Sequence, residues 1–187
     1  MSPSRTAGAL LLLLFTASGC ASLIYEIVWL QRLGLSLGAS SVSLAILLTS
    51  FMVGMCLGSS AFPRCVSPKW HPLAVYSVLE LLIAACGLII HGALPAVGKL
   101  YWSLAAHGSA DLVARAGVAL IVLLPPTALM GATLPAISRL FVSSATGMSP
   151  LGRFYAANTL GAVVGCLASG LYLLRLHDVA IATGVAV

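Results

Sequence analysis

Charged residues are scarce in this chain of 187 residues: nine Lys and Arg and four Asp and Glu make up only 7% of it. Soluble globular domains are about 25% charged and about 45–50% apolar, whereas this chain is 60% apolar. The composition therefore excludes both a soluble globular domain and a disordered segment. The few basic residues are scattered singly along the chain, which excludes a nucleic-acid-binding patch.

The residues and motifs of soluble enzymes and of metal sites are also missing. The only aspartates are Asp111 and Asp178, and no Walker A or G-x-G-x-x-G motif occurs. The five cysteines include no C-x-x-C pair and the four histidines no i, i+4 pair. A disulfide framework or a zinc site is therefore not expected. The sequence predicts no catalytic residue, no metal and no cofactor in this chain.

Long apolar runs are what the chain has instead. A helix needs about 20 apolar residues to cross a bilayer, and five runs reach that length. The runs are continuous rather than alternating, which favours helices over a transmembrane barrel. The expected spans are residues 7–30, 40–62, 73–97, 112–141 and 154–174. The sequence thus predicts an all-α, polytopic transmembrane helix bundle that forms a single domain over residues 1–187, with no soluble domain.

A sixth apolar run begins at Val179 and reaches Val187 after nine residues. Nine helical residues span about 14 Å, which is under half of a hydrocarbon core. We therefore expect a partial sixth span over 179–187, and hence a fragment or a truncated reading frame.

Basic residues in the connectors predict the orientation of the bundle. With a cytoplasmic N-terminus, Arg64 and Lys69 lie together in one short cytoplasmic connector, as the positive-inside rule favours. The remaining basic residues divide almost evenly between the two sides. We therefore expect a multi-pass protein of a bacterial-type inner (plasma) membrane, embedded in the lipid bilayer, with its N-terminus in the cytoplasm.

The first span has an alternative interpretation as a lipoprotein signal. Residues 10–15 followed by Ala-Ser-Gly-Cys at 17–20 resemble such a signal, which would be cleaved before Cys20. Position 17 holds Ala where a larger aliphatic residue is usual, and the apolar run continues to Trp29. These two observations favour a membrane span.

Glu80 lies about eight residues into the third run, roughly 12 Å from its start. A carboxylate at that depth costs several kcal/mol unless it is paired, hydrated or protonated. It is therefore either a proton or cation site, or a structural residue bonded to a neighbouring helix, and we expect it to be buried rather than to face lipid. Its candidate partners are a hydroxyl, a carbonyl freed by a proline of the fourth run, Arg139 and Arg153.

Glu26 lies near the end of the first run, between Tyr25 and Trp29, which are typical interfacial residues. We interpret it as a carboxylate that snorkels toward the outer surface, facing Arg32 or Arg115, in preference to a ligand-binding role.

The fourth run contains three prolines, Pro125, Pro126 and Pro135. Each proline removes a backbone donor, so we expect the helix to break or kink there. A broken helix can mark the binding site of a transporter. We favour a packing kink, in which Thr127 and Thr133 satisfy the freed carbonyls.

Pairs of glycines four residues apart predict close helix crossings. Two such pairs occur inside apolar runs, Gly54 with Gly58 and Gly161 with Gly165. We expect them to pack helices within one chain, with a homo-oligomer as the alternative. Asn158, near the start of the fifth run, is expected to form an interhelical hydrogen bond.

Three segments together resemble a known family. They are SGCASLIYEIVWLQRLG at 18–34, PPTALMGATLP at 125–135 and GRFYAANTLGAVVG at 152–165. Their order and spacing are similar to the N-terminal membrane region of the spermidine-synthase-like proteins, also called fused major-facilitator/spermidine-synthase proteins.

The resemblance implies a membrane module that precedes a cytoplasmic aminopropyltransferase-type domain with a Rossmann-like fold. That class of enzyme transfers an aminopropyl group from decarboxylated S-adenosylmethionine to a polyamine. None of its catalytic residues can be assigned to this chain, which lacks that domain. A separate spermidine-synthase-like protein is an alternative partner, for which the chain would be a scaffold. The other alternative is a small transporter or carrier that uses the intramembrane Glu80 and the broken fourth helix.

Overall fold

The computed structural model of the chain describes residues 5–38, 40–106, 111–140, 149–173 and 179–186. Within these ranges the chain forms helices joined by short connectors, and no strand occurs. The elements are α1 (Arg5–Leu37), α2 (Ser41–Cys65), α3 (Pro72–Ala106), α4 (Asp111–Ser138), α5 (Ser149–Leu167), the π-helix η1 (Ala168–Leu173) and α7 (Val179–Ala186). The expected all-α fold is confirmed.

Five stretches of helix are long and apolar enough to cross a membrane: Gly8–Leu35, Ser41–Cys65, Pro72–Ser103, Leu112–Ser138 and Leu151–Tyr172. At most 33% of the most apolar part of each stretch is buried inside the bundle. Most of the apolar side chains are therefore on the outside, where lipid tails are as apolar as they are. The five spans give the chain the architecture of a multi-pass membrane protein.

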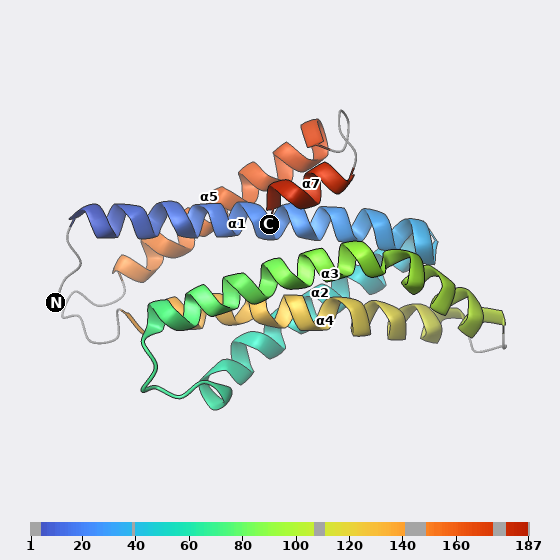
Figure 1. Cartoon of the computed structure of the whole chain (residues 1–187), viewed down its shortest axis with the longest axis horizontal. Helices are drawn as coiled ribbons and strands as arrows, with labels where there is room; N and C mark the ends of the chain where they lie inside the picture. The colour runs from blue at the N-terminus through green and yellow to red at the C-terminus, as the bar shows by residue number, and fades with distance from the viewer. Residues whose placement is uncertain (1–4, 39, 107–110, 141–148, 174–178, 187) are drawn as a thin grey trace.

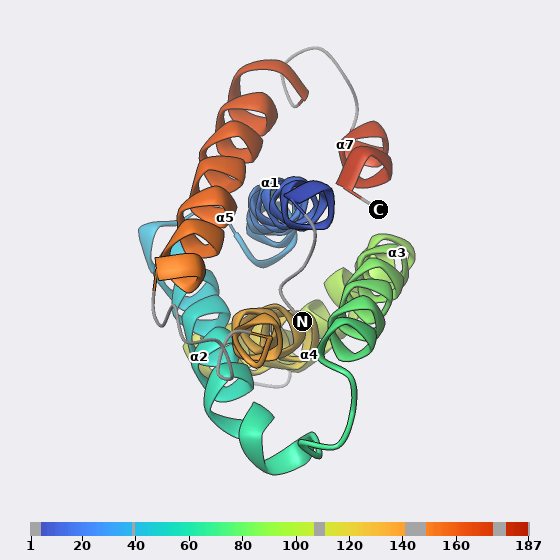
Figure 2. The same cartoon turned by 90° about the vertical axis from the view of Figure 1, so that its left-hand side faces the viewer.

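The helices form two closely packed pairs, α1 with α5 and α2 with α4, and α3 packs against α4. In the end-on view, α1 lies between α5 and α7 on one side and α2, α3 and α4 on the other (Figure 2). The starts of α1, α3 and α5 and the ends of α2 and α4 lie at one end of the bundle (Figure 1). Successive helices therefore alternate in direction, as successive membrane spans must.

Glycines make both helix pairs close. A Cβ atom at Gly54 or Gly58 of α2 would collide with Thr127 or with the Ala128 carbonyl of α4. The α1–α5 pair uses Gly161 and Gly165 in the same way, against the backbone carbonyls of Thr16 and Cys20 respectively. All four glycines of the predicted pairs are therefore covered by helices of the same chain.

The prolines of α4 do not interrupt the helix. Pro125, Pro126 and Pro135 lie inside one continuous helix, so the helix does not break there, and the favoured packing kink stays a prediction. Proline leaves one carbonyl without its usual donor, but the remaining backbone bonds and the close contact with α2 hold the helix together. Thr127 Oγ1 donates to the Leu123 carbonyl at 2.7 Å.

The threonines also differ from their expected role. Thr133 Oγ1 donates to the Met130 carbonyl at 2.7 Å. The carbonyl freed by Pro135 is that of Gly131, four residues earlier, and Thr133 does not reach it. The hydroxyls thus reinforce the adjacent turns instead of replacing the lost proline donors.

Several helix ends lie beyond the expected boundaries. α1 continues to Leu37, so Arg32 lies within the helix rather than in a connector. α2 includes Pro63 and ends at Cys65, where the Val66 amide bonds back to the Phe62 carbonyl at 3.0 Å. α3 begins at Pro72, since proline suits the first helical position, where no amide donor is needed.

Candidate functional site

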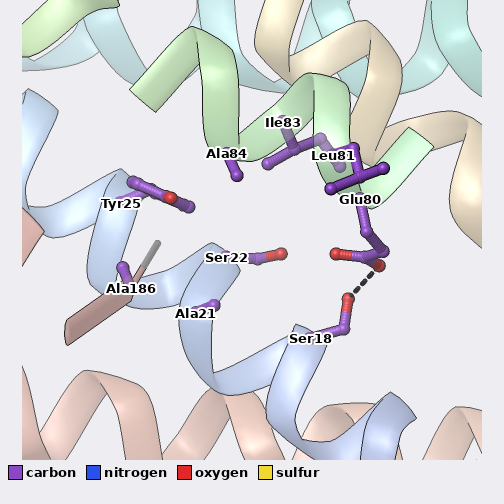
Figure 3. Close-up of a pocket in the computed structure, with 9 residues that line it drawn as sticks. All are labelled: Ser18, Ala21, Ser22, Tyr25, Glu80, Leu81, Ile83, Ala84 and Ala186. Carbon is purple, nitrogen blue, oxygen red and sulfur yellow. Dashed lines mark hydrogen bonds between the residues drawn. The ribbon is translucent and has the colours of Figure 1, made fainter. Parts of the chain in front are cut away.

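A cavity of about 170 Å³ lies between α1 and α3 (Figure 3). Cavities of this size have room for several water molecules when they are polar. Its lining residues are Ser18, Ala21, Ser22, Tyr25, Glu80, Leu81, Ile83, Ala84 and Ala186. The first four belong to α1 and the next four to α3, while Ala186 of α7 completes the wall.

The Glu80 carboxylate lies at one end of this cavity (Figure 3). Ser18 Oγ donates to Glu80 Oε1 at 2.6 Å, which is a charge-assisted bond when the carboxylate is ionised. The Tyr76 hydroxyl, one turn earlier on α3, interacts with the side chains of Ser18 and Glu80. A carboxylate has about four lone-pair positions, so Glu80 keeps acceptor capacity toward the cavity.

Tyr25 lies across the cavity from Glu80, with Ser22 between them (Figure 3). It is 1% exposed, and its hydroxyl has no hydrogen-bond partner among the described residues. Its ring stacks on Trp29, with centroids 5.1 Å apart, and contacts the backbone of α3 at Gly87. These contacts fix the ring, and the hydroxyl lies next to the space between the two helices.

Arg139 and Arg153 do not pair with Glu80. Arg139 donates to the Val66 carbonyl at 2.9 Å and to the Ser67 carbonyl at 3.3 Å. Its guanidinium also lies 4.4 Å from the centroid of the Phe62 ring. Arg153 is exposed on α5. Of the expected partner types, it is a hydroxyl, that of Ser18, that bonds to Glu80.

Glu26 and Asn158 lie away from the cavity lining. Glu26 is half-buried on α1, and its expected position facing Arg32 or Arg115 stays a prediction. Asn158 of α5 lies against Gly19 of α1, where it would collide with a Cβ atom. The described residues include no hydrogen-bond partner for the Asn158 side chain. Its expected interhelical hydrogen bond is therefore replaced by close backbone packing.

The residues around the cavity can bind a cation or hold a proton. They supply one carboxylate and three hydroxyls, and none of the nine lining residues is basic. Among the residues that the structure describes, no three His, Cys, Asp or Glu side chains gather into a metal-binding group. The site therefore has the donors for a single positive charge, but lacks the carboxylates that divalent cations prefer.

The α1 side of the site was missed because each of its residues is unremarkable alone. Ser18, Ser22 and Tyr25 are four and three residues apart, which places them on one face of a helix. A polar stripe at this spacing in an otherwise apolar span was the available signal. The spacing of Ser18, Ser22 and Tyr25 does not show that these residues face Glu80.

No protein-family profile, curated protein or solved structure matches the chain. The class of the protein is therefore defined by its architecture: it is an all-α helical bundle with five helices that can span a membrane.

Proposed function

We propose that the chain is the membrane module of a spermidine-synthase-like protein, which holds an aminopropyltransferase-type domain or partner protein at the cytoplasmic face. One observation carries this proposal. Two of the three segments that resemble the family, 125–135 and 152–165, lie at the two close helix crossings. Gly131 packs on the Met55 backbone, and Gly161 on that of Thr16.

Glycines that allow two helices to pack closely, such as Gly131 and Gly161, fit an anchoring role better than a catalytic one. At these crossings a side chain at Gly131 or Gly161 would displace a neighbouring backbone, so the segments determine helix positions. A bundle held at both crossings gives a rigid platform for a cytoplasmic enzyme.

Co-expression with a spermidine-synthase-type enzyme from the same genome tests the anchoring role. We expect the tagged chain to retain that enzyme in the membrane fraction and to co-purify with it, while the chain alone transfers no aminopropyl group. The substitutions Arg64→Glu and Lys69→Glu should weaken retention, because both side chains are exposed at the proposed cytoplasmic end. Lys99→Glu, near the opposite end of α3, is the matched control. Equal retention with and without the chain would overturn the proposal.

A carrier for a small cation is the second candidate. The observation that favours it is the Glu80 cavity between α1 and α3, where a relative movement of these two helices would change access to the site. The continuous α4 removes the broken helix from this argument, so the carrier role depends on Glu80 alone.

Uptake by proteoliposomes tests the carrier role. Radiolabelled methylammonium should enter proteoliposomes that contain the chain faster than those that contain Glu80→Gln, with Glu26→Gln as the matched control. Equal uptake with the chain and with Glu80→Gln would exclude a carrier that uses this carboxylate, and would leave the anchoring role unaffected.

A further inference from the structure

We propose that the cavity between α1 and α3 is a binding site for a small primary ammonium ion, held by Glu80 and by the hydroxyls of Ser22 and Tyr25. The three oxygen-bearing side chains reach the cavity from two helices (Figure 3). A primary ammonium group has three N–H donors and no acceptor. The oxygens of Glu80, Ser22 and Tyr25 are acceptors around a cavity of about 170 Å³, which is larger than a proton or a bare metal ion.

Charge is the first argument. Glu80 is the ninth residue of α3, about 12 Å from its start. A carboxylate at that depth requires a compensating charge, hydration or protonation. Ser18 supplies one hydrogen bond but no charge, and none of the lining residues is basic. A bound monovalent cation supplies the missing charge.

The buried Tyr25 hydroxyl is the second, independent argument. Buried hydroxyls almost always have a hydrogen-bond partner, and leaving one unpaired costs free energy. Tyr25 is 1% exposed, and no described residue accepts from its hydroxyl or donates to it. Water in the cavity would pair with this hydroxyl but would bring no charge, and protonation of Glu80 alone would leave the hydroxyl unpaired. An ammonium ion supplies both the charge and a hydrogen-bond partner.

The donor set distinguishes an ammonium ion from metal ions. Divalent cations prefer several carboxylate ligands, and among the described residues that line the cavity Glu80 alone carries a carboxylate. An alkali ion would take the same oxygens but would need further ligands in so large a space. The three N–H donors of a primary ammonium ion match the oxygens, and its organic substituent occupies part of the remaining volume.

Equilibrium binding of radiolabelled methylammonium to the full chain in lipid nanodiscs tests the site. We expect saturable binding to one site. Glu80→Gln should weaken it at least tenfold, because a hydrogen bond to a charged group is lost. Ser22→Ala and Tyr25→Phe should each weaken it about two- to tenfold, as expected for one neutral hydrogen bond. Glu26→Gln, a carboxylate of α1 outside the cavity, should bind as the unmodified chain does.

The thermal stability of Tyr25→Phe adds a measurement that does not depend on the ligand. Without methylammonium this variant should be at least as stable as the unmodified chain, because an unpaired buried hydroxyl is removed. With methylammonium it should gain less stability than the unmodified chain. A loss of stability without ligand would show that the hydroxyl has a structural partner, and would overturn the proposal.

Three binding results would also overturn it: no saturable binding, binding unchanged in Glu80→Gln, or sodium binding that depends on Glu80 and that methylammonium does not displace. The measurement involves neither a synthase nor a flux. Failure of this site is therefore distinguishable from failure of the anchoring or the carrier role.

Discussion

The hydroxyl of Ser18 donates a hydrogen bond to the carboxylate of Glu80 at 2.6 Å, and so joins α1 to α3 in the apolar part of the bundle. The two residues are 62 positions apart in the chain. The α1–α3 contact is less extensive than the contacts within the α1–α5 and α2–α4 pairs, so this bond adds a polar link to a limited helix contact.

Replacing Glu80 should separate its hydrogen-bonding role from its charge. Glu80→Gln should change the free energy of unfolding by less than about 1 kcal/mol, because the amide oxygen can still accept from Ser18. Glu80→Leu should destabilise the chain by about 1–3 kcal/mol, because the Ser18 hydroxyl loses its acceptor. Unfolding in mixed micelles with increasing SDS measures both values.

Ser18→Ala completes a double-mutant cycle with Glu80→Leu. If the hydrogen bond stabilises the fold, the double variant should lose less stability than the two single variants together. Additive losses would show that the bond contributes nothing measurable.

Gly161→Ala should weaken the α1–α5 crossing. The added Cβ would collide with the backbone carbonyl of Thr16, so one helix must move, at a cost of about 1–3 kcal/mol. Gly152→Ala in the same helix is the control: its Cβ would contact nothing within 4 Å, and alanine favours the helix by about 1 kcal/mol. The same SDS titration should show opposite shifts for the two variants, and equal shifts would contradict the observed crossing.

Arg139→Lys should loosen the connector between α2 and α3. The guanidinium donates to two carbonyls of the connector and lies over Phe62, whereas lysine is a point charge that cannot reproduce this geometry. Hydrogen exchange of residues 66–71 should become faster. Arg64→Lys is the control, since Arg64 bonds only to the Ser60 carbonyl of its own helix. Unchanged exchange in Arg139→Lys would show that the connector is held by other contacts.

The orientation of the bundle is tested with reporter fusions. We expect a fusion after Pro68 to report a cytoplasmic location and one after His107 a location on the opposite side. The reason is the positive-inside rule applied to Arg64 and Lys69, together with Arg139, which bonds to their connector, and Arg153, near the start of α5. A reporter active outside the cytoplasm after Pro68 would reverse the orientation.

Helices were predictable because their signal is local. An apolar run of 20 residues determines a span by itself, and all five expected spans correspond to helices. At Pro125 and Pro126 the sequence shows the lost backbone donors but not whether the helix continues, because that depends on the helix packed beside it. The contact of Gly54 with Thr127, next to these prolines, exists only in the folded bundle.

The candidate site was only partly predictable, because it depends on which helix faces which. Glu80 is conspicuous in sequence as a carboxylate in an apolar run. The stripe of Ser18, Ser22 and Tyr25 follows from helical periodicity, but its position opposite Glu80 is a tertiary relationship. The same holds for Arg139, which was a candidate partner of Glu80 and contacts the α2–α3 connector instead.

The two close helix pairs are nested along the sequence: α2 and α4 both lie between α1 and α5, and α3 lies between α2 and α4. During synthesis the inner pair can therefore close as soon as α4 has emerged, whereas α1 must wait in the bilayer until α5 follows. At about 5–20 residues per second, that wait lasts seconds, during which the glycine-facing surface of α1 is unpaired. The order of synthesis thus closes the α2–α4 pair before the α1–α5 pair, although α1 is made before α2.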